Sequence, residues 1–134
     1  MHVVLRSQCS LLRLKKNRKV ISDLLSQYSN RFNIRIYQNS LNSNHIHLVC
    51  LAKERRHLQN FLRVFAGQVA QCITGCKKGN ALNIPFWSKI AWSRIVEWGR
   101  AFKIAINYVM QNQMEALGII PYTPRKTKPR ILRI

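Results

Sequence analysis

The pattern of apolar and polar residues predicts four short β-strands along the chain, with clear alternation in the first two. Because successive side chains of a strand point to opposite faces, each strand would have one apolar face. We expect these strands in MHVVLRS (1–7), RFNIRIYQNS (31–40), NSNHIHLVC (42–50) and SKIAWSRIV (88–96).

Apolar residues at helical spacing predict three helices between and after these strands. They are expected from about Asn17 to Arg31, from Glu54 to Ile73, and from Trp98 to Glu115. The basic, proline-interrupted segment PYTPRKTKPRILRI at 121–134 has no such pattern. We therefore expect one domain at 1–118, followed by a basic, flexible tail at 119–134.

The predicted element order is β-α-β-β-α-β followed by one more helix. Short hairpins and right-handed crossovers fold this order into a ferredoxin-like α+β domain, a four-stranded antiparallel sheet with two helices on one face. The helix-covered face is expected to carry Val3, Leu5, Ile34, Ile36, Ile46 and Leu48. The opposite face is expected to carry His2, Arg6, Arg35, Tyr37, His45 and His47, which makes it the candidate functional surface.

The charge of the chain is strongly positive, with 23 Lys and Arg against 4 Asp and Glu, a net charge of +19 and a pI near 11.0. Such a charge favours binding to nucleic acid, although a basic ribosome-associated protein would share it. The few carboxylates argue against a two-metal nuclease site, which needs several acids at one point. They are scattered at Asp23, Glu54, Glu97 and Glu115.

No apolar run approaches the roughly 18 residues needed to cross a bilayer, and no signal-peptide pattern opens the sequence. We therefore expect a soluble, intracellular protein with no membrane contact. Four cysteines form neither a disulfide framework nor a paired zinc motif. Cys72 and Cys76 lie one helical turn apart, so they are half a metal site or, more simply, free thiols.

His45 and His47 lie on one face of their predicted strand, where two imidazoles could bind one metal ion. They could equally be two ordinary, partly buried histidines. On the last helix, Tyr108 and Asn112 are four residues apart and share a face, with Gln111 within reach. If this helix crosses the open side of the sheet, a hydroxyl and an amide approach the histidines; otherwise Tyr108 is a packing residue.

The segments NHIHLV and FWSKIAWSRIVEWGRAFKIAINYVMQNQMEALG resemble the single-tyrosine HUH transposases that act on single-stranded DNA. The most similar branch is associated with repetitive extragenic palindromes, and the resemblance runs from the first strand through Gly118. The chain departs from the family pattern at Ser43, where many relatives have Met-Pro before the Asn, and it lacks a glycine-rich stretch after the first strand.

The resemblance implies a metal-dependent enzyme that cleaves single-stranded DNA and transfers the strand through a 5′-phosphotyrosine. His45 and His47 would hold a divalent cation, Mg²⁺ or Mn²⁺, with Asn112 completing the site and Gln111 as the fallback. Tyr108 would be the nucleophile. Relatives act on DNA hairpins as monomers, or as homodimers that exchange the tyrosine helix. A non-catalytic, domesticated DNA-binding protein on the same fold is the alternative.

DNA phosphates would be contacted by basic side chains along the path of the strand. The candidates are Arg6, Arg35, Arg55, Arg56, Lys77, Lys78, Arg125, Lys126, Lys128, Arg130 and Arg133.

Overall fold

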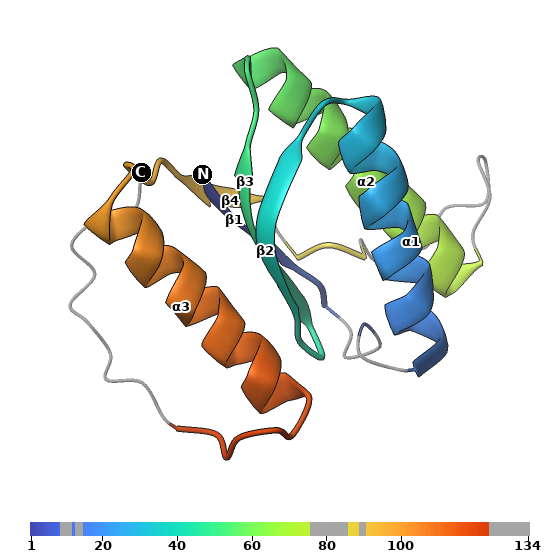
Figure 1. The fold of residues 1–134 in the computed structure, drawn as a ribbon. Coiled ribbons are helices and arrows are strands. Elements are labelled where there is room, and N and C mark those ends of the chain that lie inside the picture. The colour runs from blue at the N-terminus through green and yellow to red at the C-terminus, as the bar shows by residue number, and fades with distance from the viewer. Residues whose placement is uncertain (9–11, 13–14, 76–85, 89–90, 124–134) are drawn as a thin grey trace.

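The fold is taken from a computed structural model that describes residues 1–8, 12, 15–75, 86–88 and 91–123. The predicted order of strands and helices is confirmed (Figure 1). The elements are β1 (His2–Arg6), α1 (Lys15–Arg31), β2 (Arg35–Leu41), β3 (His45–Leu51), α2 (Arg55–Thr74), β4 (Trp92–Arg94) and α3 (Arg100–Ala116).

The four strands form one antiparallel sheet in the order β2-β3-β1-β4. Helices α1 and α2 lie side by side on one face of this sheet, and α3 lies alone on the other face (Figure 1). The α+β fold predicted from the sequence, including a separate C-terminal helix, is therefore confirmed.

The main core lies between the sheet and the α1–α2 pair. Val3 and Leu48 are fully buried there, and the rings of Phe61 and Phe65 on α2 stack 5.4 Å apart. The six residues assigned to the helix-covered face all belong to this cluster or pack against it. Gly75 ends α2 with a φ of 71°, a left-handed conformation that glycine adopts without steric cost.

A second, smaller cluster attaches α3 to the opposite face. Val49 of β3 packs there with Ala105 and Val109 of α3, and all three are buried. Near the end of α3, Gln113 Oε1 accepts a hydrogen bond of 2.8 Å from the backbone N–H of Leu41, on β2 at the edge of the sheet. These contacts hold α3 over β2 and β3, so the remainder of this face is open to other uses.

Several element boundaries differ from the sequence prediction: α1 begins at Lys15 rather than Asn17, and β2 and β3 begin at Arg35 and His45 rather than at 31 and 42. Strand β4 has three residues, Trp92–Arg94, because only these pair with β1; part of the predicted 88–96 strand, residues 89–90, lies outside the described residues. Helix α3 begins two residues later than expected, since Gly99 has a φ of 97° that no helix accommodates. The differences at β4 and α3 are local to the segment that leads into α3.

The end of the chain is described as far as Thr123, beyond the end of α3. The division into a domain at 1–118 and a tail at 119–134 stays a prediction. None of the helices in the described residues is long and apolar enough to span a membrane.

The Gln113 contact predicts a specific loss of stability. Gln113→Ala removes the acceptor for the Leu41 N–H and should lower the free energy of unfolding by about 1 kcal/mol, measured by urea denaturation. Gln111→Ala is the matched control, because the Gln111 amide donates only along its own helix, to Glu115. An equal loss in both variants would contradict the anchoring role of Gln113.

Candidate active site

The pairing of β1 with β3 places histidines from both strands on the open face of the sheet. In this register Val4 lies opposite His47 and Arg6 lies opposite His45. Because directly opposed residues share a face and side chains alternate along a strand, His2 joins His45 and His47 there. The sequence prediction for this face is correct for these residues.

The three imidazoles are in contact. His2 Nε2 and His47 Nδ1 share a hydrogen bond of 3.0 Å, and their rings stack with centroids 5.3 Å apart. The His45 ring meets the His47 ring edge-on at 4.8 Å. His2 and His47 are each only 6% exposed, whereas His45 lies closer to the surface.

Helix α3 brings Tyr108 to this cluster. Its ring centroid lies 5.7 Å from that of His47 and 6.1 Å from that of His2, edge-on to both. Tyr108 is nevertheless 38% exposed, because it sits at the margin of the α3 interface and Val109 fills its centre. A tyrosine is thus held against the histidines on a surface that a large substrate can reach.

Asn112 follows Tyr108 by one helical turn and is 9% exposed. Its Nδ2 donates to the backbone carbonyl of Tyr108 at 2.8 Å, so the amide oxygen is the atom left to act as a ligand. The Gln111 amide instead donates to Glu115 Oε1 at 2.9 Å. The described residues contain no group of three His, Cys, Asp or Glu side chains placed to hold a metal. The ligand set predicted from the sequence, His45, His47 and Asn112 with Gln111 as the fallback, stays a prediction.

Burial keeps two of these histidines neutral. It lowers the pKa of His45 from 6.5 to about 4, helped by the positive charge of Arg6. Burial lowers the pKa of His2 to about 4 as well, helped by Arg94. His45 Nδ1 donates to Asn44 Oδ1 at 2.8 Å, because an amide oxygen can only accept. Nε2 of neutral His45 therefore keeps the lone pair that a metal ligand needs.

Comparison with known proteins identifies the family. The family described as "Transposase IS200 like" matches residues 1–111. The chain belongs to the IS200-like transposase family. The match includes all three histidines and Tyr108, and it confirms the resemblance found in the sequence.

Two solved structures of transposases have a similar fold. One is a REP-associated tyrosine transposase bound to a REP hairpin, with a TM-score of 0.66 and 13% identity over 85% of this chain and 66% of that one. The other is a protein assigned as a transposase in Deinococcus radiodurans R1, with a TM-score of 0.56 and 12% identity over 84% and 88%. No curated protein sequence matches significantly.

Two of the basic residues predicted to contact DNA, Arg6 and Arg35, lie near the open face of the sheet. Arg6 is exposed beside His45, and Arg35 is exposed at the start of β2, where its guanidinium lies 5.9 Å from the centre of the Tyr37 ring. Arg55 and Arg56 are exposed at the start of α2, and Arg56 pairs with Glu54 at 3.0 Å. The other candidates lie outside the described residues: Lys77, Lys78, Arg125, Lys126, Lys128, Arg130 and Arg133.

Three residues that contact the histidines or lie beside them were not selected from the sequence as site residues. His2 contacts His47 directly, Trp92 meets the His2 ring edge-on at 5.5 Å, and Arg94 lies opposite His2. The two-residue alternation of the predicted 88–96 strand places Trp92 and Arg94 on one face. It does not reveal the register in which this strand pairs with β1, so the contact with His2 could not be predicted.

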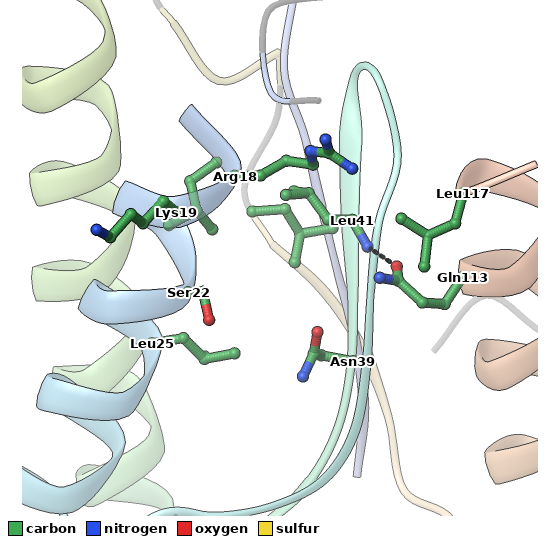
Figure 2. Close-up of a pocket in the computed structure, with 10 residues that line it drawn as sticks. Arg18, Lys19, Ser22, Leu25, Asn39, Leu41, Gln113 and Leu117 are labelled. Atoms are coloured by element: carbon green, nitrogen blue, oxygen red, sulfur yellow. Dashed lines mark hydrogen bonds between the residues drawn. The ribbon is translucent and has the colours of Figure 1, made fainter. Parts of the chain in front are cut away.

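A separate cavity of about 370 Å³ lies between α1, β2 and the end of α3 (Figure 2). Arg18 and Lys19 of α1 line one side, and Gln113 and Leu117 close the other (Figure 2). None of the three clustered histidines lines it, and neither does Tyr108. This cavity is therefore distinct from the histidine–tyrosine cluster.

The lowered pKa values predict loss of stability in acid. Between about pH 6.5 and 4 the unfolded chain takes up protons at His2 and His45 that the folded protein does not, so stability is complete above pH 6.5 and falls as the pH decreases through this window. The melting temperature should drop by about 5 °C or more from pH 7 to 4.5. The drop should be smaller in His45→Gln; an equal drop in both proteins would contradict the assignment for His45.

Proposed function

We propose that this protein is a transposase that cleaves single-stranded DNA and transfers the cut strand through a covalent bond to Tyr108. The observation that carries the proposal is the position of Tyr108, edge-on to His47 and His2 and still 38% exposed. At this partly exposed position, Tyr108 can meet a phosphodiester that lies across the histidines.

The chemistry needs one bond to form and one to break at phosphorus. The Tyr108 oxygen attacks the scissile phosphate, the bond from phosphorus to the 3′ oxygen breaks, and the 5′ end of the DNA becomes linked to tyrosine. The tyrosine loses its proton, and the departing 3′ oxygen gains one. Because the new phosphodiester conserves the bond energy, a second 3′ hydroxyl can later reverse the step and join a different strand.

The residues present fit a divalent cation, Mg²⁺ or Mn²⁺. His45 Nε2, a ring nitrogen of His47 and the Asn112 amide oxygen would hold it, with Gln111 as the fallback if Asn112 does not reach. A bound cation would draw electron density from the scissile phosphate and stabilise the charge that develops there. Arg6, next to His45, would bind a neighbouring phosphate of the strand.

The substrate class rests on charge and on the similar structures. A net charge of +19 supports binding to a polyanion, and one structure of similar fold was solved with a REP hairpin. We therefore include single-stranded DNA with a hairpin as the substrate, encountered at the bacterial nucleoid by a monomer or a homodimer. The alternative, a non-catalytic DNA-binding protein, is favoured by the same net charge and leaves the histidine–tyrosine contacts without a use.

The nucleophile is tested by covalent trapping. The protein is incubated with end-labelled hairpin DNAs and Mn²⁺, and adducts are separated on a denaturing gel. We expect Tyr108→Phe to abolish the adduct, because the attacking oxygen is gone, without reducing DNA binding. Tyr122→Phe is the matched control, since Tyr122 is 70% exposed and outside the cluster, and should form the wild-type amount. An adduct in Tyr108→Phe would refute the assignment; DNA binding without any wild-type adduct would favour the non-catalytic alternative.

The role of Arg6 is tested through the salt dependence of DNA binding. If Arg6 neutralises one phosphate, Arg6→Ala should reduce the slope of log K against log [salt] by about 1. Arg31→Ala is the control, because Arg31 lies at the end of α1 over the Phe32 ring, on the helix-covered side. Equal slopes for Arg6→Ala and the wild type in fluorescence anisotropy titrations would exclude this phosphate contact.

A further inference from the structure

His2 is a buried polar side chain with no part in the chemistry proposed above. Its ring is 6% exposed and is enclosed by three other rings, stacked on His47 and edge-on to Trp92 and Tyr108. An alanine or a leucine would fill such a space without the cost of burying a polar group. The hydrogen bond to His47 is the contact that an apolar residue could not make.

The bond between His2 Nε2 and His47 Nδ1 contains a single proton, and its position decides what His47 can do. If the proton is on His2, neutral His47 carries its own proton on Nε2 and cannot bind a cation through that atom. If the proton is on His47 Nδ1, His2 accepts it and His47 Nε2 has the lone pair. Only the second arrangement gives His47 a ligand atom pointing away from His2.

Building on the proposed function, we infer that His2 is a positioning residue that holds His47 in the Nδ1–H form and fixes its ring for cation binding. Metal-bound histidines commonly donate their second ring nitrogen to such a partner, which orients the ring and increases its basicity. His45 has the equivalent partner in Asn44 Oδ1, at 2.8 Å. Each of the two candidate ligands thus has its own orienting acceptor, one from the neighbouring residue and one from β1.

The geometry argues against His2 as a third ligand of the same ion. A ring nitrogen that shares a proton with His47 cannot give its lone pair to a metal at the same time. The shared bond also lies on the Nδ1 side of His47, whereas the cation would bind through Nε2. Trp92, packed against the His2 ring, helps to keep it at this bonding distance.

Mn²⁺ binding to the DNA-free protein, measured by water-proton relaxation, tests the inference without using activity. His2→Phe keeps an aromatic ring and removes the acceptor, and should weaken Mn²⁺ binding by about 10- to 100-fold. His2→Gln can place an amide oxygen where Nε2 lies and should bind close to wild type. Unchanged affinity in His2→Phe would overturn the positioning role, and so would equal weakening in both variants at unchanged melting temperature.

A second measurement needs no variant of His2 and remains decisive if His2→Phe does not fold. Long-range ¹H–¹⁵N spectra of the Mg²⁺-loaded wild-type protein report which nitrogen of each imidazole carries a proton. The four histidines are few enough to assign, with His45→Gln and His57→Gln helping to separate the signals. We expect a protonated Nδ1 and an unprotonated Nε2 on His47; the reverse pattern would overturn the inference.

The failure of this inference and that of the proposed function give different results. If Mn²⁺ binds to the wild type and is lost in His47→Ala but unchanged in His2→Phe, only the positioning role is wrong. If the wild-type protein binds no Mn²⁺ with or without hairpin DNA, the proposed metal site is wrong and the role of His2 falls with it. Covalent trapping at Tyr108 tests the nucleophile separately.

Discussion

The antiparallel register between β1 and β3 is the constraint on which the remainder of the site depends. With His2 opposite Val49 and Arg6 opposite His45, the apolar residues Val3 and Leu48 face the main core. A slip of one residue would turn the histidines of one strand into that core and expose its apolar side chains. Burial of the core therefore fixes the face on which the histidines of both strands lie.

The open face of the sheet has to bury apolar surface and also remain accessible. Helix α3 meets both requirements, because its contacts concentrate on β2 and β3. The smaller hydrophobic cluster attaches the helix through Val49, Ala105 and Val109, and Gln113 bonds the end of the helix to β2. Tyr108 lies at the margin of this cluster, where its ring contacts the histidines and the residue is 38% exposed. The same packing that attaches the helix thus positions the tyrosine.

Much of this arrangement could be predicted from periodicity alone. The two-residue alternation in β1 and β3 placed His2, His45 and His47 on one face, and the helical stripe placed Tyr108 one turn from Asn112. Contacts that depend on strand register could not be predicted: the His2–His47 bond joins residues 45 positions apart. Strand β4 was predicted too long, since the apolar residues Ile95 and Val96 extend the strand-like segment whereas pairing with β1 ends at Arg94.

The distribution of charge explains why neutral ligands suit this site. None of the four carboxylates lies on β1, β3 or β4, and Glu115 is occupied by Gln111. Arg6 lies opposite His45 and Arg94 lies opposite His2. Burial, together with the positive charge of these arginines, lowers the pKa of both histidines and keeps them unprotonated at neutral pH. Two imidazoles and an amide do not offset the charge of a divalent ion. Under the proposed function the balancing negative charge arrives with the DNA phosphate, so cation and DNA would bind more tightly together than separately.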